Sequence, residues 1–460
     1  MPDGSSRVFD VAIIGAGAVG CAMARRFARH GARVLLLERG SDILSGASKA
    51  NSAILHTGFD APPGSLERLC MQDGYREYLA IRAARNLPLL QTGALVVAWT
   101  DDEVWRLDAL LRQAHDNGVG DVRRIGRADL LRLEPNLAAS AKAALHVPGE
   151  HVIDPWSPFL SYVLEAQALG AEIVLNAEVT GGEFDGQTWT LATGQGGFRA
   201  ATVINCAGLY GDRIEAALLG AATFQIRPRK GQFVVLDKAA ARLLTAIILP
   251  VPGERTKGVL LARTVFGNVL VGPTAEDQTD RERAAVSGAE LRTLLDRAAT
   301  LLPALRDIPV TAAYAGLRPA SEHKHYRVHR LDGKNWITVG GIRSTGMTAA
   351  LGIARHVWGL YAGDAGAPAE TAAPVPMPNL AEHLPRDWQH PGYGEIVCQC
   401  ELVTSREIEA ALSGALPAGD LGGLKRRTRC AMGRCQGFVC AGRLAELTAG
   451  RFRESLAQPA

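Results

Sequence analysis

Two groups of residues in this chain have the types and the spacing that chemistry needs. One is a glycine-rich turn, GAGAVG at residues 15–20, and the other is a set of cysteines near the C-terminus. The turn follows an apolar run at 11–14 and leads into a predicted helix over 18–30. A second apolar run at 34–37 ends at Glu38. Strand, glycine turn, helix, strand and acid in this order are typical of a dinucleotide-binding unit.

Each glycine of the turn has its own task in such a unit. Gly15 allows the tight turn, Gly17 lets the backbone approach a pyrophosphate, and Gly20 lets the helix pack close to the sheet. The helix N-terminus offers N–H groups and a partial positive charge to the phosphates. Glu38 follows Gly20 by 18 residues, where its carboxylate can accept both ribose hydroxyls. We therefore predict a nucleotide site, the alternative being a glycine-rich turn in an ordinary α/β unit.

The cysteines are spread unevenly. Three lie far apart, whereas five fall close together in the tail: Cys398, Cys400, Cys430, Cys435 and Cys440. Because the N-terminus has no apolar signal core, this crowding favours a metal or redox centre over disulfide bonds. Four thiolates would hold a 2Fe–2S cluster, and the alternatives are a structural zinc or free thiols. Spacing alone leaves open whether Cys430 replaces Cys435 or Cys440 as a ligand.

The composition is that of a soluble globular protein. The 460 residues, 47% hydrophobic and 21% charged, allow two or three domains and a large core. The net charge is +3 without a long basic run, so we expect no nucleic-acid partner. No apolar stretch approaches the ~18–20 residues of a membrane span. We expect a cytoplasmic protein that contacts the inner face of the membrane, if at all, through a partner.

The elements that position these groups follow from the apolar pattern. Strand and helix patterns alternate in the first half, where a second strand–glycine–helix layout appears at 202–219. Alternating apolar residues over 223–316 predict an antiparallel sheet, interrupted by a helix at 288–300. A hairpin over 325–339 and a long helix over 344–361 follow.

The C-terminal part has a different composition. Proline and alanine dominate residues 363–390, which predict a linker that wraps the surface. A capping box at residues 404–407 begins a helix in the module that follows, whose small core would need a staple such as the cysteines. Four basic residues near the cysteines could form a solvated helix face, tune a cluster, or dock an acidic electron acceptor. They are Lys425, Arg426, Arg427 and Arg429.

Besides GAGAVG and Glu38, several segments between residues 8 and 362 have recognisable motifs: 48–66, 202–212, 229–233, 257–262, 271–277, 315–321 and 340–354. FAD is favoured over a nicotinamide because the glycine turn is at the extreme N-terminus and a β-rich insert splits the nucleotide-binding strands. Taken together, these motifs resemble the glycine-oxidase and D-amino-acid-oxidase superfamily of FAD-dependent enzymes. Within it, they are most similar to the glycerol-3-phosphate and L-2-hydroxyglutarate dehydrogenase branch.

The resemblance implies an α/β fold in which a Rossmann-like FAD-binding domain is interleaved with an antiparallel-sheet substrate domain. This oxidoreductase domain would cover residues 1–362. Its FAD part would comprise about 1–90, 150–222 and 325–362, and its substrate part about 91–149 and 223–324. The linker and a small α-helical module at 391–460 would follow.

A second resemblance covers residues 395–445. The segments VCQCELVTSREIEAAL and LKRRTRCAMGRCQGFVC are similar to the bacterioferritin-associated-ferredoxin type of 2Fe–2S module, which is also fused to anaerobic glycerol-3-phosphate dehydrogenases. That family's pattern implies that Cys398, Cys400, Cys435 and Cys440 hold the cluster. A cluster accepts one electron at a time, which favours a dehydrogenase over an oxidase.

The superfamily resemblance also implies the residues that contact FAD. Ser48, Lys49, Asn51 and Ser52 would lie at the ribityl or pyrophosphate region, and the backbone of Val179 at the adenine. The N-terminus of the helix predicted at 344–361 would face the flavin pyrimidine and stabilise an anionic reduced flavin. Further cofactor contacts would come from Gly208, Gly341, Gly346, Met347 and Thr348.

Four residues would form the reaction site by the same resemblance. His56 would be the base that removes the hydroxyl proton, although a lone loop histidine is more often a hydrogen-bonded turn residue. Lys257 and Arg318 would hold the phosphate or carboxylate of the substrate, the alternative being surface cations at strand ends. Ser344 would lie near the flavin. Arg343 departs from some oxidases of the branch and adds a cation for a carboxylate or a second anionic group.

The function implied is an FAD-dependent dehydrogenase that oxidises a small anionic 2-hydroxy compound. Glycerol 3-phosphate is the first candidate and L-2-hydroxyglutarate the next, with electrons passing through the cluster to an acceptor protein or a quinone-linked subunit. An amine or imino-acid dehydrogenase is an alternative that His56 disfavours. A non-catalytic electron-transfer or redox-sensing component is another, which Lys257 and Arg318 disfavour.

Overall fold

The first apolar run forms the central strand of an eight-stranded sheet. The computed structural model describes residues 7–253, 258–363 and 372–456. The strands of this sheet are β1 (Val8–Ile14), β2 (Val34–Leu37), β9 (Glu172–Val174), β10 (Val179–Phe184), β11 (Trp189–Thr193), β12 (Gly196–Asn205), β19 (Arg327–Leu331) and β20 (Trp336–Gly340). Strands β20, β12, β1, β2 and β9 run parallel in this order, and the hairpins β10–β11 and β19–β20 extend the sheet.

Both faces of this sheet are covered, as a parallel sheet requires. Val11 and Ile13 of β1 point into one core, whereas Ala12 and Ile14 point into another. Several helices pack on the first face, and one helix packs against β10, β12 and β20 on the second. The helices are α1 (Ala18–Arg29), α2 (Leu66–Ile81), α5 (Ser157–Ala168) and α8 (Gly346–Ala362) on the first face and α6 (Gly211–Leu219) on the second. The α/β prediction is confirmed.

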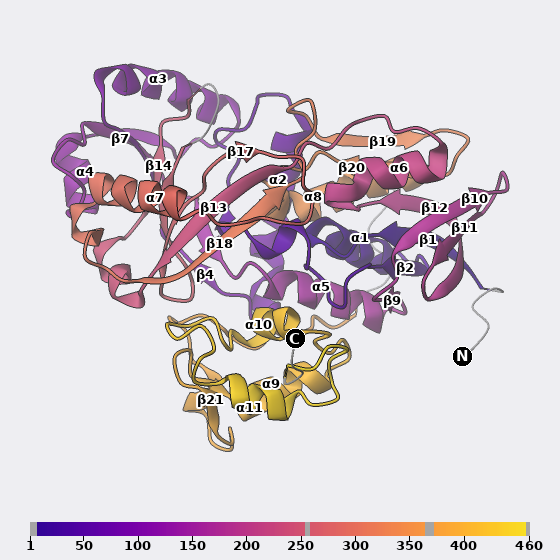
Figure 1. Ribbon diagram of the computed structural model, residues 1–460. Helices are drawn as coiled ribbons and strands as arrows, with labels where there is room; N and C mark the ends of the chain where they lie inside the picture. The colour runs from indigo at the N-terminus through magenta and orange to yellow at the C-terminus, as the bar shows by residue number, and fades with distance from the viewer. Residues whose placement is uncertain (1–6, 254–257, 364–371, 457–460) are drawn as a thin grey trace.

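A nine-stranded sheet forms the other half of the main body (Figure 1). Its strands are β5 (Ala94–Ala98), β6 (Arg123–Gly126), β7 (Ala143–Val147), β13 (Arg229–Leu236), β14 (Ile247–Pro250), β15 (Leu260–Arg263), β16 (Val269–Gly272), β17 (Glu276–Asp277) and β18 (Val310–Arg318). The strands within residues 223–316 pair antiparallel, as the sequence predicts. The sheet as a whole is mixed, because β14 pairs with β5 in parallel. No hairpin joins these two strands, so no tight turn forces them to be antiparallel.

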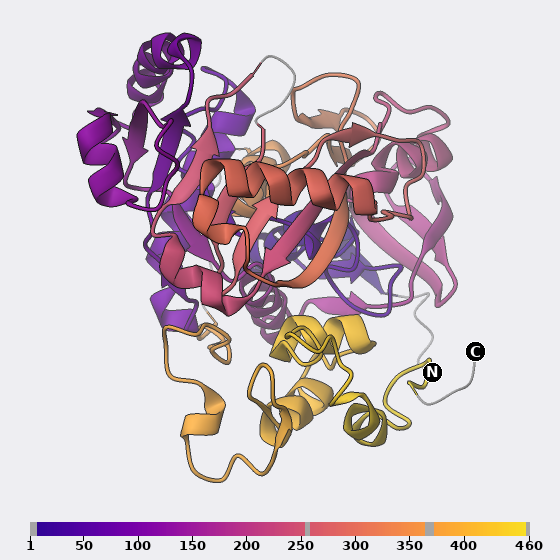
Figure 2. The ribbon, with the colours of Figure 1, turned by 60° about the vertical axis from the view of Figure 1, so that its left-hand side comes forward.

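Three helices pack against strands of the nine-stranded sheet. They are α3 (Asp101–Asp116), α4 (Arg127–Leu133) and α7 (Gly288–Leu301). Figure 2 shows α7, orange-red, lying across one face of the sheet. Val234 and Leu236 of β13 pack against Leu294 of α7 in a core on this face. The other face is turned toward the eight-stranded sheet. Among the described residues, no helix is long and apolar enough to cross a membrane.

A third, small sheet is formed by strands that lie, in chain order, where the chain passes from one large sheet to the other. It consists of β3 (Ile54–Leu55), β8 (His151–Ile153) and β4 (Leu89–Leu90), with β8 in the middle. The segment after Glu38 contains β3 and one 3-10 turn. The 3-10 turns are Ala47–Lys49, Ala83–Arg85, Gly208–Tyr210, Lys238–Leu243, Pro303–Leu305 and Asp387–Gln389.

The described part of the predicted linker packs into the main core. Met377, Leu380 and Ala381 are buried there, because these apolar side chains interrupt the prolines. The backbone of Met377 bonds with Arg85 and Asn86. Residues 364–371 of the predicted linker lie outside the described residues. A surface wrap is thus an incomplete description of this segment.

The C-terminal module contains three helices and a two-stranded sheet. Its elements are β21 (Ile396–Cys398), β22 (Val403–Thr404), α9 (Ser405–Ser413), α10 (Leu421–Thr428) and α11 (Ala441–Leu447). The predicted capping box is confirmed, because the Thr404 side chain accepts from the Glu407 N–H and the Glu407 side chain accepts from the Thr404 N–H. The module is helical as predicted, and the short β21–β22 pair is an element that the prediction lacks.

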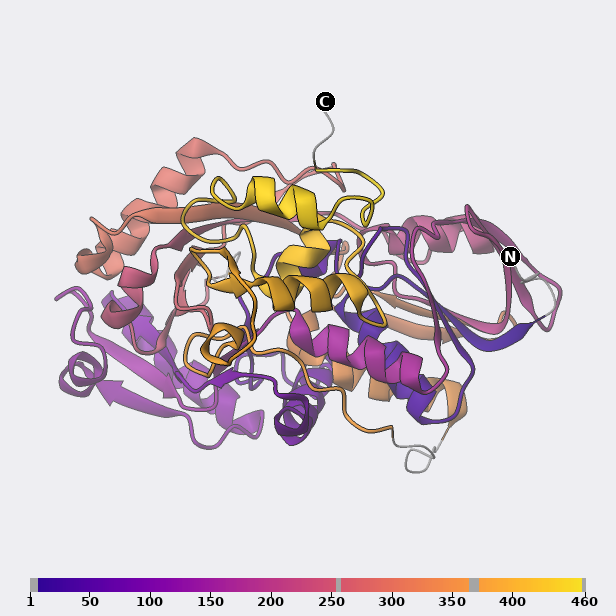
Figure 3. The same cartoon turned by 90° about the horizontal axis from the view of Figure 1, so that it is seen from below.

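Helix α10 holds the module against the loop that follows β2. Arg427 forms two bonds to Asp42, at 2.6 and 3.0 Å, and Asp42 is fully buried. Arg426 donates to the carbonyl of Ile43 at 3.0 Å. A Cβ at Gly423 would lie 1.6 Å from an Asp42 oxygen, so only glycine allows this approach. Figure 3 shows the module, yellow and orange, beside α5.

The basic residues near the cysteines are therefore neither a solvated face nor an acceptor surface, apart from Lys425. Arg426, Arg427 and Arg429 are buried. Arg429 bonds to Glu401 at 3.1 Å and lies 3.9 Å above the ring of Phe266. The interpretation as a solvated or docking face is wrong, because these arginine side chains are buried. Their partners, Asp42 and Glu401, are not neighbours in the sequence, so the local pattern does not reveal them.

Replacing Arg427 should destabilise the protein strongly. Arg427→Met would leave the buried Asp42 carboxylate without its charged partner, which costs about 3–5 kcal/mol of unfolding free energy. Urea unfolding measures this loss. The control is Arg124→Met, which breaks the 2.6 Å pair with the half-exposed Asp108 and should cost about 0–1 kcal/mol. Equal losses in the two variants would contradict the role of Arg427 in holding the module against the loop that follows β2.

Candidate functional site

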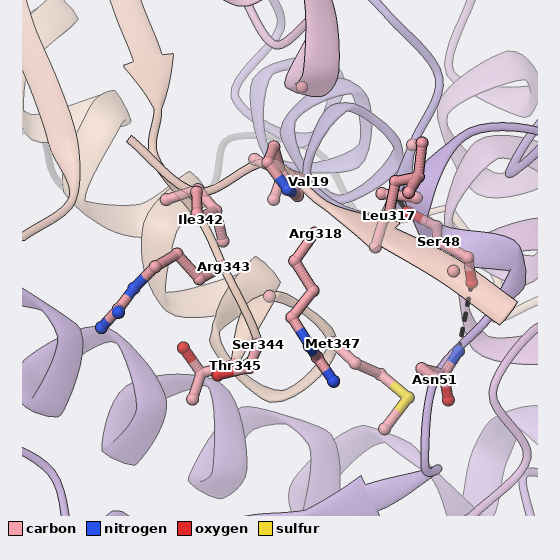
Figure 4. A pocket seen from close by; sticks show the side chains of 18 of the residues that line it. Val19, Ser48, Asn51, Leu317, Arg318, Ile342, Arg343, Ser344, Thr345 and Met347 are labelled. Atoms are coloured by element: carbon pink, nitrogen blue, oxygen red, sulfur yellow. Dashed lines mark hydrogen bonds between the residues drawn. The ribbon is translucent and has the colours of Figure 1, made fainter. Parts of the chain in front are cut away.

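A cavity of about 940 Å³ lies between the two large sheets. Ile14, Leu37 and Cys206 line it from the carboxyl ends of β1, β2 and β12, which is where ligands bind in open parallel sheets. Val96 and Phe233 line it from the nine-stranded sheet. Figure 4 shows the part of this cavity into which Arg318 projects.

The glycine turn at the start of α1 is as tight as the sequence predicts. Gly15 has φ +102°, which favours glycine, and a Cβ at Gly20 would lie 1.9 Å from the Gly15 carbonyl oxygen. Gly17 faces the cavity, and the neighbouring Ala18 N–H donates to Ser48 Oγ at 2.9 Å. Gly20 therefore sets the distance between the helix and the turn, while Gly17 and Ser48 face the ligand space.

Glu38 is held by the backbone at the end of β2. Its two carboxylate oxygens accept the N–H groups of Ala16 and Gly40, each at 2.8 Å. A carboxylate oxygen has a second lone pair, so both oxygens can still accept a ribose hydroxyl. The side chain lines the same end of the cavity as Val179.

Two helices begin at the cavity wall. Helix α1 has no acidic residue in its first turn and no side-chain cap, and the same is true of α8, whose first residues Gly346, Met347 and Thr348 line the cavity. The N-terminus of a helix carries a partial positive charge. The arrangement favours a ligand with negative or electron-rich groups at two separate places.

His56 lies at the junction of the small sheet and α8. Its N–H donates to Thr348 Oγ1 at 3.1 Å, and its Nδ1 lies 2.7 Å from Glu150 Oε2. Its side chain is 21% exposed and lines the cavity, whereas that of Glu150 is fully buried. Leu55 pairs with His151 in the antiparallel ladder, and this register brings residue 56 opposite residue 150.

Arg318 places a partly buried cation in the same cavity. It lies at the end of β18, and Figure 4 shows it projecting between Asn51 and the segment with Ser344. Burial, with the nearby charges of Arg229 and Arg343, lowers its pKa to about 10. The guanidinium thus stays charged at neutral pH but has lost much of its hydration. A site with these properties attracts an anion.

The structure brings together most of the residues predicted for the site. Those that line the cavity are Gly15, Gly17, Glu38, Ser48, Asn51, Ser52, His56, Val179, Gly208, Arg318, Gly341, Ser344, Gly346, Met347 and Thr348. Gly20 and Lys49 lie behind this wall, and the Lys49 carbonyl accepts from Trp156 Nε1 at 3.3 Å. Lys257 lies outside the described residues. Arg343 and Lys324 also line the cavity.

Glu150 is a site residue that sequence reasoning misses. It lies in a segment, residues 144–154, that gives only a strand-and-turn pattern. Its partner His56 is 94 residues away, and only the register of the small sheet connects them. A pairing of this kind leaves no signal in a single sequence.

The tail cysteines lie near one another in the module. All of them are free thiols, and hydrogen bonds link the side chain of Cys400 with that of Cys435 and the side chain of Cys440 with that of Cys398. The charge of Cys398 acts on Cys400 and that of Cys435 on Cys440, so the two pairs adjoin. As placed, no group of three or more His, Cys, Asp or Glu side chains within the described residues could hold a metal ion.

The loop between Cys435 and Cys440 directs backbone N–H groups at one thiol. The N–H of Val439, helped by the Cys400 thiol and the N–H groups of Gly437 and Phe438, lowers the pKa of Cys435. Such bonds stabilise a thiolate, the form that binds iron. Cys430 is different, because burial raises the pKa of its thiol to about 12.

Comparison with known proteins decides the family. Residues 10–359 match the protein family DAO, which is described as "FAD dependent oxidoreductase". The chain belongs to the FAD-dependent oxidoreductase family. The match ends before the module, so the resemblance of residues 395–445 to a 2Fe–2S module stays a prediction.

Several relatives of this FAD-dependent oxidoreductase have named activities. "Glycerol 3-phosphate dehydrogenase" of Caloramator mitchellensis is 32% identical over 458 residues, covering 96% of this chain and 94% of that protein. One component of the anaerobic glycerol-3-phosphate dehydrogenase of Escherichia coli K12 is 28% identical, with coverages of 96% and 88%. The reduced, FAD-bound L-α-glycerophosphate oxidase of Mycoplasma pneumoniae superposes with a TM-score of 0.72 at 27% identity, covering 77% of this chain and 95% of that one.

FAD is accordingly the cofactor of this oxidoreductase, and the cavity fits it. Glu38, Val179, His56 and Ser344 all line this one cavity, and the glycine turn lies on its wall. An acid for the ribose, a glycine turn for the pyrophosphate and a helix N-terminus for the ring system are therefore all present.

Gly20→Ala should reduce FAD binding. The added methyl group would clash with the Gly15 carbonyl and push α1 away from the turn, so FAD affinity should fall by at least about 10-fold. The flavin content of the purified protein and titration of the apoprotein with FAD measure this. Gly359→Ala is the control, because Gly359 lies in helix α8 with open space around its Cβ position. Unchanged affinity in Gly20→Ala would disprove the close-packing role of Gly20.

Proposed function

We propose that this protein is an FAD-dependent dehydrogenase that oxidises a small anionic 2-hydroxy compound, with glycerol 3-phosphate as the first candidate and L-2-hydroxyglutarate as the next. The observation that carries the proposal is one cavity lined by both His56 and the partly buried cation Arg318, in a member of the FAD-dependent oxidoreductase family. The names of the relatives, glycerol 3-phosphate dehydrogenase above all, support the substrate class.

Each proposed site residue has a task that its chemistry fits. Arg318 binds the phosphate or carboxylate of the substrate, together with Lys257, and Ser344 lies beside the reacting end of the cavity. His56 accepts the proton of the substrate hydroxyl as the adjacent C–H bond breaks. Bound FAD supplies the acceptor for the hydride that leaves this carbon. The products are a ketone and a protonated His56.

The cofactor would be held along the cavity by the residues predicted for it. Glu38 binds the ribose, Val179 contacts the adenine through its backbone, and α8 faces the flavin. The remaining contacts are assigned to Gly15, Gly17, Gly20, Ser48, Lys49, Asn51, Ser52, Gly208, Gly341, Gly346, Met347 and Thr348. The FAD part would comprise about residues 1–90, 150–222 and 325–362, and the substrate part about 91–149 and 223–324.

Electrons would leave through a 2Fe–2S cluster held by Cys398, Cys400, Cys435 and Cys440 in a module at 391–460. The two adjoining thiol pairs and the N–H groups directed at Cys435 support this ligand set. The acceptor would be a protein or a quinone-linked subunit, since the relative from Escherichia coli is itself named as one component of a larger dehydrogenase. Phe438, 90% exposed between Cys435 and Cys440, would be accessible to such a partner.

An anaerobic reduction screen tests the activity. We expect glycerol 3-phosphate, or failing that L-2-hydroxyglutarate, to bleach the flavin absorbance, and His56→Ala to slow this reduction by ~10²-fold or more. Arg318→Met should raise the substrate Kd by about 10- to 100-fold through loss of a charged hydrogen bond. The exposed Arg227→Met is its control. Bleaching by amines alone would favour an amine dehydrogenase. If no substrate bleaches the flavin, the result would favour a redox component without catalytic activity.

The iron content of the protein tests the cluster. We expect about two iron atoms and two sulfides per chain. Serine in place of Cys398, Cys400, Cys435 or Cys440 should lower the iron content while FAD remains bound. Cys430→Ser is the matched control and should retain iron. Zinc in place of iron, or loss of iron in Cys430→Ser with retention in Cys435→Ser or Cys440→Ser, would contradict this ligand set.

A further inference from the structure

We propose that Glu150 is a positioning residue that fixes the tautomer of His56, with the proton on Nδ1 and the lone pair on Nε2. The inference rests on the proposed function of His56 as the base. Glu150 acts on His56 and not on the substrate. Glu150 would make the imidazole of this cavity-lining residue ready to accept a proton at the nitrogen that is not bonded to Glu150.

The contacts of Glu150 leave little freedom to its carboxylate. Oε2 lies 2.7 Å from His56 Nδ1, while Oε1 accepts both the N–H of Thr57 at 2.6 Å and its hydroxyl at 2.8 Å. The side chain is fully buried. A buried carboxylate keeps its charge only where donors surround it, and here His56 and Thr57 provide three.

The surrounding backbone holds the pair in place from both sides. The hydroxyl of Tyr75 donates to the carbonyl of Gly149 at 2.7 Å, next to Glu150. A Cβ at Gly149 would lie 2.8 Å from Thr57 Cγ2, so the turn before Glu150 packs directly on Thr57. On the other side, the N–H of His56 is bound to Thr348 of α8. Neither residue can shift without breaking several contacts.

These contacts determine which nitrogen carries the proton. An ionised carboxylate only accepts hydrogen bonds, so Nδ1 of a neutral His56 must donate to Oε2. The lone pair is then on Nε2, at the edge of the ring away from Glu150, and His56 lines the cavity. When Nε2 takes the hydroxyl proton, the imidazolium has a carboxylate beside it, which stabilises the new positive charge. The proton moves from substrate oxygen to Nε2, and Glu150 keeps its charge throughout.

The test compares Glu150→Gln with the wild-type chain, both loaded with FAD. The amide keeps the size of the side chain but can donate to Nδ1, which would move the imidazole proton to Nε2. In ¹⁵N NMR spectra, with His56→Asn for assignment, we expect wild type to show protonated Nδ1 and Glu150→Gln protonated Nε2. The rate of flavin reduction should fall by ~10²- to 10⁴-fold, as when an amide replaces a carboxylate that orients a histidine. The substrate Kd should remain unchanged.

A matched control is Glu134→Gln. Glu134 is also a buried glutamate that accepts two backbone N–H groups, from Thr245 and Ala246, but it lies outside the cavity. This variant should leave the His56 tautomer and the reduction rate unchanged. If Glu150→Gln does not fold, Thr57→Val removes one donor to Glu150 and should slow reduction by about 3- to 10-fold.

The outcomes separate this inference from the proposed function. A wild-type His56 with its proton on Nε2 overturns the inference, whatever the substrate proves to be. An unchanged reduction rate in Glu150→Gln also overturns it, while wild-type reduction by a hydroxy compound upholds the proposed function. If no hydroxy compound reduces the flavin, the proposed function fails, and the NMR spectra still decide whether Glu150 sets the tautomer.

Discussion

A carboxylate without access to water, Asp42, connects the parts of this protein. In a medium of low dielectric constant it needs charged or N–H partners, and Arg427 and the Gly419 N–H of the module provide them. The same loop carries Glu38 and Gly40 on its N-terminal side, and the Leu44 N–H bonds to the Ala16 carbonyl of the glycine turn. The nucleotide end of the cavity and the module therefore share one loop. Whatever displaces this loop affects both.

A second connection runs from the module to the cavity wall through aromatic rings. Arg429, next to Cys430, covers the ring of Phe266, which stacks on Trp156 with 5.7 Å between the ring centres. Trp156 donates to the carbonyl of Lys49, whose neighbour Ser48 lines the cavity. The side chains of Arg429, Phe266 and Trp156 are buried, so the module packs on the oxidoreductase as part of one body. This packing explains why the sequence alone misplaces the basic residues of the tail.

The sequence predicts well what depends on neighbours along the chain. The strand, turn and helix at 8–30, the capping box at Thr404 and the hairpin β19–β20 all follow from local patterns, and the structure has them. It fails where the partner is distant, as in the parallel pairing of β14 with β5. The sequence also fails to predict the pairing of Arg427 with the buried Asp42, because a charged residue in a helix does not indicate a distant buried partner. Such pairs depend on tertiary packing, which a single sequence does not record.

The pair of His56 and Glu150 has the same origin. Between β4 and β8 the chain contributes β5, β6 and β7 to the nine-stranded sheet, and it returns at β8. There β8 pairs with β4 on one side and β3 on the other, so one strand closes this excursion and aligns Glu150 with His56. A one-residue shift of this register would turn the neighbouring side chains to the opposite face. The environment of His56 is thus fixed by the strand that joins the two halves of the molecule, and not by the loop that contains His56.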